Sequence, residues 1–435
     1  MRFPGRRKHT HYFPVHARDP VLQASGHLTR RGTGHLVGID QTLVDIDARV
    51  DETLLTRFGL TKGLSSLIDD ARAAELYDEL HRRALISYEF AGGTVGNTLH
   101  NYSLLADDAS ILLGVMSETI RVGTSGYRYL SNTSSRVNLD YLQPVDGPIG
   151  RCFALVTPDG ERTFAINEGR MNGLLKESIP AHVFADASAL VLSAYLLRAK
   201  PGDPMPEATM RAIELAKAHH VPIVLGLGTA FVIAERPAFW RSFIAEHIDV
   251  VAMNEEEGAA LTGEADPLAA CDHTLQWADL VLCTAGPTGL YLAGYTDDAV
   301  KRETRYPLLP GSIPEFNRYE FSRPMLKARC KKPVKVYAHI APYHGGPEHI
   351  RSTNGAGDAA LSALLHDMSA NRYHKEIVPN SAKHVCEFLT YSSMSQVCRY
   401  ANRVSFEVLA HASPRLSRGL PEREDGLDDE AYWAR

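Results

Sequence analysis

A short segment of small residues near the C-terminus has the composition needed to transfer a phosphoryl group. Residues 351–360 have the sequence RSTNGAGDAA, and the helix-like run LSALLHDM follows directly. At the first turn of a helix, backbone N–H groups and the positive end of the helix dipole bind anions. Asp358 lies in that turn, where its carboxylate would repel a phosphate. Its presence is explained if it accepts the proton of a hydroxyl group that attacks phosphorus.

Two other interpretations of this segment stay open. An aspartate at a helix start is often only a favourable charge or a cap. The spacing Gly355-x-Gly357-x-x-Ala360 also fits the loosened dinucleotide-binding fingerprint. We favour phosphoryl transfer, because that fingerprint normally lies in the first strand–helix–strand unit of a domain. The chain contains no G-x-x-x-x-G-K-[ST] motif, which excludes a P-loop kinase.

Three other segments place glycine or polar residues after apolar, strand-like runs. They cover residues 91–98 (AGGTVGNT), 254–257 (NEEE) and 284–289 (TAGPTG). Taken singly, the first would be an ordinary turn and the third a simple hairpin turn. The acidic run would be a solvated helix start, because the helix dipole favours acidic side chains there.

The elements expected around these segments indicate an α/β fold. From about residue 185 onward, apolar strands such as ASALVLS and VPIVLGLG alternate with amphipathic helices such as EATMRAIELAKA. This alternation predicts a mainly parallel sheet covered by helices on both faces. We expect the first strand over residues 35–40, a helix over about 63–84, and two final helices over about 356–370 and 380–411.

The segment before this alternation has a different pattern. The short runs YRYLSN, RCFALV and RTFAIN are separated by turn signals, which is typical of strands in a small β-rich unit. We therefore divide the chain into five parts: a basic N-terminal extension (1–34), the first part of the α/β domain (35–120), a β-rich lid (121–170), the second part of the α/β domain (171–413) and a charged C-terminal tail (414–435).

A proline-rich, basic insertion over residues 295–350 interrupts the strand–helix alternation. The simplest interpretation is a solvated surface excursion. An alternative is that the insertion flanks a phosphate-bearing nucleotide or contacts a second subunit in a homo-oligomer.

The composition of the chain excludes several classes of protein. With 46 basic and 52 acidic residues, it has no general electrostatic basis for binding nucleic acid or an acidic membrane. No stretch approaches the roughly 18 apolar residues of a membrane span, and no apolar run follows the basic N-terminus as in a signal peptide. The six cysteines form no C-x-x-C pair, so we expect free thiols in a reducing cytoplasm.

The segment 352–358 resembles the D-T-x-G-A-G-D signature of the ribokinase-like (PfkB) family of sugar and nucleoside kinases. The segments at 91–98, 254–257 and 284–289 are similar, in the same chain order, to the family's substrate segment, N-x-x-E element and T-x-G-x-x-G turn. The resemblance implies a three-layer α/β/α fold with a mostly parallel central sheet and a small β-rich lid. It also implies ATP-dependent phosphorylation of a hydroxyl group.

The resemblance implies a role for each matched residue. Asp358 would be the catalytic base, and the anion hole beside it would comprise Gly355, Ala356 and Gly357. The residues implied to bind ATP are Thr284, Gly286, Gly289 and Asn354. Asn254 and Glu257 would hold Mg²⁺ through water, which agrees with the preference of this ion for oxygen ligands. A potassium-like ion is in doubt, because Ser352 stands where the signature usually has Asp.

The implied substrate is a nucleoside. The segment QTLVDI is similar to the one in family nucleoside kinases whose Asp binds the ribose 2′ and 3′ hydroxyls, and Asp45 is the match. Asp40 is a nearby alternative, and one of the two would then be a cap or a surface residue. The other residues implied to hold the ribose are Gly92, Gly93 and Asn97.

Nearly the whole chain resembles the bacterial inosine–guanosine kinase branch of the family. The N-terminal sequence, the segment GIDQTLVDIDARVD and the long insertion carry this resemblance. It implies transfer of the ATP γ-phosphate to the 5′ hydroxyl of inosine or guanosine in purine salvage. Alternatives are a kinase of the same family for adenosine or a sugar, and a nucleoside-binding regulator without turnover.

Overall fold

The computed structural model describes residues 35–106, 108–117, 119–198, 200–304 and 313–420. The predicted N-terminal extension (1–34) and most of the predicted tail (421–435) lie outside the described residues. Among the described residues, no helix is long and apolar enough to cross a membrane.

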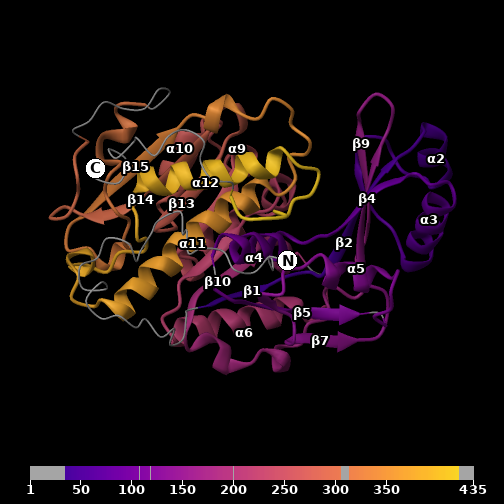
Figure 1. The fold of residues 1–435 in the computed structure, drawn as a ribbon, viewed down its shortest axis with the longest axis horizontal. Coiled ribbons are helices and arrows are strands. Elements are labelled where there is room, and N and C mark those ends of the chain that lie inside the picture. Colours follow the sequence, from indigo (N-terminus) through magenta and orange to yellow (C-terminus); the bar gives the residue numbers. More distant parts are fainter. Residues whose placement is uncertain (1–34, 107, 118, 199, 305–312, 421–435) are drawn as a thin grey trace, which may run out of the picture.

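A large sheet organises most of the chain (Figure 1). Its strand order is β15-β14-β13-β12-β11-β10-β1-β5-β6, with β7 paired to β5 as well. The strands are β1 (His35–Ile39), β5 (Ser110–Ser117), β6 (Val137–Asn138), β7 (Leu142–Val145), β10 (Ala187–Ser193), β11 (Ile223–Gly226), β12 (Val250–Asn254), β13 (Leu280–Thr284), β14 (Leu290–Asp297) and β15 (Pro333–Ile340). All pairs are parallel except β13–β14 and β14–β15.

Helices cover both faces of the large sheet. One face packs against α4 (Thr94–Leu105), α11 (Ala356–Ile377) and α12 (Met394–Leu409). The other face packs against α6 (Met205–Ala218), α7 (Ala230–Glu235), α8 (Pro237–His247), α9 (Glu255–Thr262) and α10 (Pro267–Thr274).

The sequence of strand β10 is continuously apolar because both faces of the strand are buried. Ala189 and Val191 join the core under α4 and α11, whereas Leu190 and Leu192 join the core on the opposite face. Successive side chains of a strand point to opposite faces, so a strand covered on both sides buries all of them.

A smaller five-stranded sheet lies beside the large one (Figure 1). Its order is β3-β9-β8-β2-β4, from β2 (Leu43–Arg49), β3 (Ser65–Leu67), β4 (Ile86–Ala91), β8 (Gly150–Val156) and β9 (Arg162–Asn167). In β2, Val44 and Ile46 are buried with residues of α2 (Glu52–Arg57) and α3 (Asp70–Arg82). The alternate residues, Asp45 and Asp47, lie on the opposite face of the strand.

The predicted fold class, a three-layer α/β/α domain with a mostly parallel sheet and a small β-rich lid, is confirmed. The segment 121–170 supplies β8 and β9 to the small sheet, while β2, β3 and β4 come from earlier in the chain. The run YRYLSN, expected as a strand, instead forms α5 (Ser125–Ser131). This helix begins after Thr124, whose side chain accepts a hydrogen bond from the N–H of Tyr127.

Three other boundaries differ from the prediction. The helix expected over 63–84 begins only at Asp70, after Asp69 caps it, and β3 precedes it. The last helix begins at Met394 rather than near residue 380, because Arg323 holds the intervening loop through the backbone oxygens of Lys383 and Thr390. Within the insertion, β15 is an edge strand of the large sheet, so the interpretation as a purely solvated excursion is wrong there.

Burial of β10 in two cores predicts its contribution to stability. Leu190 is fully buried, so Leu190→Ala should lower the free energy of unfolding by about 2–5 kcal/mol. Leu67→Ala is the matched control, because Leu67 is 53% exposed and should lose less than about 0.5 kcal/mol. Chemical denaturation of both variants tests this, and equal losses would contradict the assignment of the core.

Candidate active site

Two crossings of the chain between the sheets define the candidate site. Asp40 follows β1 of the large sheet, and the chain enters β2 of the small sheet at Leu43. The chain returns through Gly92 and Gly93, which separate β4 from the first turn of α4. The carboxyl end of a parallel strand and the start of a helix thus meet, as they commonly do at the ligand sites of α/β proteins.

Asp358 lies in the first turn of α11 and is connected to α4. The Asn97 side chain donates a hydrogen bond from Nδ2 to Oδ2 of Asp358, at 3.1 Å. The turn depends on Gly355, whose φ of 78° is left-handed and whose added Cβ would lie 2.5 Å from Cβ of Pro414. Gly357 is exposed, while the N–H of Ala356 donates to the backbone oxygen of Thr353 at 3.4 Å.

Asp40 is a buried cap of α4. Its Oδ2 accepts the N–H of Gly96 at 2.6 Å, and its Oδ1 accepts the N–H of Gln41 at 2.9 Å. Gly93 has a φ of 92°, and a Cβ at this residue would lie 2.2 Å from Oδ2 of Asp40. The structure therefore gives Asp40 a capping role between β1 and α4.

Asp45 lies next to the other glycine of the pair. A Cβ at Gly92 would lie 2.5 Å from Oδ2 of Asp45, so a larger residue there would displace this carboxylate. Asp45 is partly exposed, in contrast to Asp40, which is 2% exposed. Of the two candidate carboxylates, Asp45 is the one accessible to a ligand.

Arg415 joins these residues, although sequence analysis assigned it to a charged tail. Its Nε donates to Oδ1 of Asn97 at 2.9 Å, and one terminal nitrogen donates to the backbone oxygen of Gly92 at 3.1 Å. The other terminal nitrogen donates to Oγ1 of Thr133 at 2.8 Å. No motif marks Arg415; the nearby apolar residue Leu416, which is also buried, is the signal that could have indicated an ordered segment.

Burial raises the pKa of several carboxylic acids in this region to about 7. For Asp40, loss of water outweighs the backbone N–H donors and Arg415, which lower its pKa. Burial also raises the pKa of Asp45 to about 7, with a further increase from Asp47. The pKa of Asp358 is about 7 because burial and nearby carboxylates outweigh the hydrogen bond from Asn97. An acid with a pKa near the working pH is suited to accept a proton in catalysis.

Asn254 and Glu257 form a reciprocal cap at the start of α9. Oδ1 of Asn254 accepts the N–H of Glu257 at 2.8 Å, and Oε2 of Glu257 accepts the N–H of Asn254 at 3.0 Å. Burial raises the pKa of Glu257 to about 7, so a cation close by would favour its ionised form. Among the described residues, no three acidic, histidine or cysteine side chains are grouped as metal ligands. Because Oδ1 of Asn254 and Oε2 of Glu257 already accept backbone N–H groups, these residues suit an indirect contact with an ion, through water, better than direct ligation.

The turn over residues 284–289 lies beside the first turn of α11. A Cβ at Gly357 would lie 4.0 Å from Oγ1 of Thr284, and Asn254 is the sheet partner of Thr284. Gly289 has a φ of 103°, and a Cβ there would lie 2.0 Å from the backbone oxygen of Ile340, so glycine is required for the strand pairing. Gly286 is exposed, with a left-handed φ of 44°.

Two expectations remain for the glycine-rich turn before α11: the places of Asn354 and Ser352, and the dinucleotide-binding interpretation. Asn354 is exposed, and its N–H donates to Oγ of the buried Ser352 at 3.2 Å. The turn follows the antiparallel edge strand β15 and not the first parallel strand of the sheet. This position argues against the dinucleotide-binding interpretation.

The raised pKa of Asp358 predicts a pH-dependent effect on stability. An aspartic acid in an unfolded chain has a pKa near ~4. Between about pH 4 and 7 the folded state therefore keeps the proton of Asp358, whereas the unfolded state has released it. The stability that this proton contributes falls as the pH rises over this range and is lost above about pH 7. Asp358→Asn removes this loss and should raise the melting temperature more at pH 7.5 than at pH 5.5. Asp78→Asn, at an exposed position, is the control, and an equal increase at both pH values would contradict the prediction.

Comparisons with known proteins bear on the family and the fold of the chain. The model of the pfkB carbohydrate kinase family matches residues 69–307. The guanosine-inosine kinase of Escherichia coli (strain K12) is 62% identical over 435 residues, which is 100% of each chain.

Two of the solved structures that share the fold are an adenosine kinase and a probable sugar kinase. The adenosine kinase of Sinorhizobium meliloti has a TM-score of 0.62 at 20% identity, over 89% of this chain and 98% of that chain. A probable sugar kinase of Rhizobium etli has a TM-score of 0.63 at 18% identity, over 90% and 97%.

The family match includes the segments that contain Asn97, Asn254 and Thr284, and the full-length relative also covers Asp45 and Asp358. The predicted family is thereby confirmed. The chain belongs to the pfkB family of carbohydrate kinases.

Proposed function

We propose that the protein transfers the γ-phosphoryl group of ATP to the 5′ hydroxyl of guanosine and inosine, which yields GMP and IMP. The observation that carries this proposal is the 62% identity to a guanosine-inosine kinase over the full length of both chains. The site supports it, because the hydrogen bond from Asn97 to Asp358 joins the predicted nucleoside segment to the predicted anion-binding turn.

In this proposal Asp358 takes the proton of the 5′ hydroxyl as its oxygen attacks the phosphorus. The pKa of about 7 supports the role, since a base with this pKa holds a proton well enough to remove it and is still partly ionised at neutral pH. The backbone N–H groups of the turn at Gly355, Ala356 and Gly357 would stabilise charge on the transferred group. An incoming phosphoryl oxygen would replace the long contact from Ala356 to Thr353.

Asp45 would bind the ribose, and Asp40 would hold the neighbouring backbone in place. A partly exposed carboxylate can accept hydrogen bonds from two adjacent hydroxyl groups. Asp40 is occupied by the N–H groups of Gln41 and Gly96, so its contribution would be to hold α4 and Gly93 in place. Asn97, at the start of α4, would help to hold the ribose through its side-chain amide.

ATP would bind along the turn that contains Thr284, Gly286 and Gly289, with Asn354 at its edge. Mg²⁺ would supply charge neutralisation of the phosphates, and Asn254 and Glu257 would hold its water ligands. A monovalent cation beside the turn would have no carboxylate at residue 352, where Ser352 accepts an N–H of Asn354. Such an ion would depend on backbone carbonyl oxygens alone.

We place the protein in the cytoplasm, where ATP and nucleosides are available. All six cysteines lie in the described residues and are free, which suits a reducing compartment.

The acceptor specificity tests this function directly. ADP release from MgATP is measured with guanosine, inosine, adenosine, cytidine, ribose and fructose supplied separately. We expect turnover with guanosine and inosine and little with the others. Turnover with adenosine or a free sugar alone would keep the chemistry and remove the substrate assignment. No turnover with any acceptor, together with binding of nucleoside and ATP, would indicate a regulator.

The assignment of the base predicts a loss in kcat. Asp358→Asn keeps the size of the side chain but removes its proton affinity, so kcat should fall by at least ~10²-fold while nucleoside binding changes little. Steady-state kinetics and calorimetric nucleoside binding measure the two effects separately. A variant that keeps more than about a tenth of the activity would exclude Asp358 as the base.

The role of Asp45 predicts discrimination between ribose and deoxyribose. The wild type should prefer guanosine over 2′-deoxyguanosine, because a carboxylate that loses a hydroxyl partner is left poorly paired. Asp45→Ala should reduce this preference in kcat/KM by at least about 10-fold. Asp47→Ala is the comparator, since Asp47 follows on the same face of β2. If only Asp47→Ala changed the preference, the ribose contact would belong to Asp47.

A further inference from the structure

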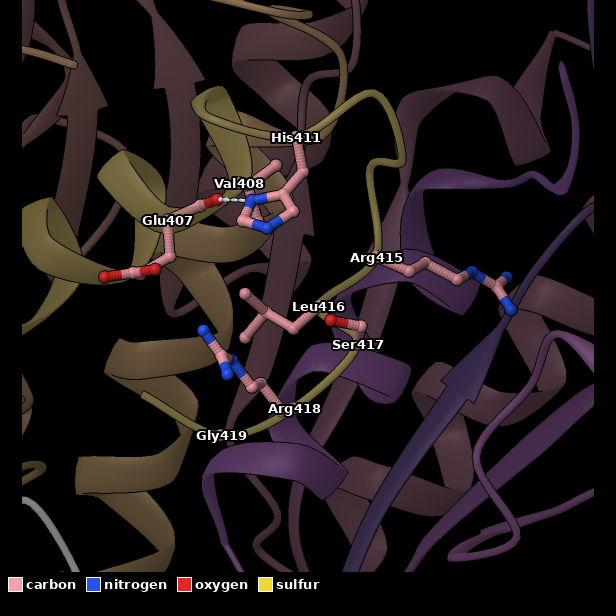
Figure 2. Close-up of a pocket in the computed structure, with 8 residues that line it drawn as sticks. All are labelled: Glu407, Val408, His411, Arg415, Leu416, Ser417, Arg418 and Gly419. Carbon is pink, nitrogen blue, oxygen red and sulfur yellow. Dashed lines mark hydrogen bonds between the residues drawn. The ribbon is translucent and has the colours of Figure 1, made fainter. Parts of the chain in front are cut away.

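Arg415 comes from a segment that the reaction described above does not use. It follows α12, and Figure 2 shows its side chain extending away from the neighbouring Leu416 and Arg418, toward the ribbons of the N-terminal part of the chain. The residue is 5% exposed. Burying a guanidinium group is costly unless its charge and hydrogen bonds are satisfied, so its contacts indicate what it does.

Two of the hydrogen bonds from Arg415 reach residues around Asp358, and the others, to Asn132 and Thr133, reach the chain just after α5. The guanidinium donates to Oδ1 of Asn97, to the backbone oxygen of Gly92 and to Oγ1 of Thr133. It also lies 5.6 Å from the centre of the Tyr129 ring. Asn97 and Gly92 are adjacent to the candidate base and the candidate ribose carboxylate, whereas Thr133 anchors the guanidinium from the side.

The hydrogen bond to Asn97 decides which way its amide points. A guanidinium group only donates hydrogen bonds, so the oxygen of the amide must face it. The amide nitrogen then faces Asp358, to which it donates at 3.1 Å. With the opposite orientation, an amide oxygen would face the carboxylate and repel it. Arg415 thus determines that Asp358 receives a donor on Oδ2.

We infer that Arg415 is a positioning residue for phosphoryl transfer: it orients Asn97, and through Asn97 it fixes the carboxylate of Asp358 toward the accepting hydroxyl. This inference rests on the proposed function. The fixed contact on Oδ2 restricts rotation of the carboxylate group and so limits the directions in which its other oxygen can point. The contact to Gly92 additionally ties this chain of hydrogen bonds to the crossing between the two sheets.

The charge of Arg415 gives a second, separable effect. Asp40, Asp45, His100 and the Tyr129 hydroxyl face the guanidinium, and its charge lowers the pKa of both carboxylic acids. Burial, and then the same charge, lower the pKa of His100. Asp40, Asp45 and Glu257 in turn act on Asp358, whose pKa the Asn97 donor lowers. Loss of Arg415 would therefore remove the charge that favours ionised Asp40 and Asp45, and the fixed donor that favours ionised Asp358.

The main test is Arg415→Gln, with guanosine and MgATP as substrates. We expect kcat to fall by about 10²-fold, since small displacements of reacting groups have effects of this size. The acid limb of the kcat/KM profile should move to higher pH. Arg418→Gln is the matched control, because Arg418 lies exposed on the same segment, and it should keep wild-type kinetics (Figure 2).

Two further variants separate positioning from charge and from folding. Arg415→Lys keeps the charge without the planar set of donors, so it should shift the acid limb less than Arg415→Gln does and still have a low kcat. In Arg415→Ala, added guanidinium ion at millimolar concentration should restore part of the kcat, but it should not activate the wild type. Because the added ion can act only on folded enzyme, a lower melting temperature of the Arg415→Ala variant would not explain such a rescue.

A double-mutant cycle with Asn97→Ala tests the route of the effect. If Arg415 acts through Asn97, Arg415→Gln should reduce kcat much less in the Asn97→Ala protein than in the wild type. Full additivity, or an Arg415→Gln enzyme with wild-type kcat and pH profile, would overturn the inference. A wild type without turnover on any nucleoside would instead contradict the proposed function, so the two failures are distinguishable.

Discussion

The structure depends on the balance of charge where the two sheets meet. Asp40, Asp45 and Asp358 are held in a region where burial raises each pKa to about 7, and the guanidinium of Arg415 lies among them. Carboxylic acids so placed are partly protonated at neutral pH, which limits their mutual repulsion. The same condition makes Asp358 available as a proton acceptor in the helix start that is proposed to bind phosphate. Stability therefore favours the protonated form of these groups, whereas the proposed chemistry requires Asp358 to be ionised.

Close approach of backbone and side chain makes this arrangement sterically feasible. A Cβ at Gly92 would meet Asp45, and one at Gly93 would meet Asp40, so the glycine pair brings the chain back to α4 past both carboxylates. Asp40 then caps α4 through Gly96, and this cap places Asn97 one residue later, opposite Asp358. Two of the crossings between the sheets, from β1 to β2 and from β4 to α4, thus contain the residues proposed to hold the nucleoside, so a movement of the small sheet would act directly on them.

Much of this could be predicted from the sequence, because the signals were local. The alternation of strands and helices gave the parallel sheet, and the apolar run of β10 indicated burial on both faces. The glycine-rich turn before α11 and the Asn254–Glu257 cap are short-range patterns of a helix start. The composition of the small sheet could not be predicted in the same way, since β2 pairs with β8 across more than a hundred residues. Arg415 was missed for the same reason: its partner Asn97 is 318 residues away, and no pattern near Arg415 identifies that contact.

The central claim is that Asp358 is a poorly solvated base with a pKa near neutrality, oriented by Asn97. Its titration by ¹³C NMR of carboxyl-labelled aspartate tests this most directly, with the signal assigned by its loss in Asp358→Asn. The account predicts a midpoint near pH 7 in the free protein. A midpoint near ~4, the value of a solvated aspartic acid, would contradict it.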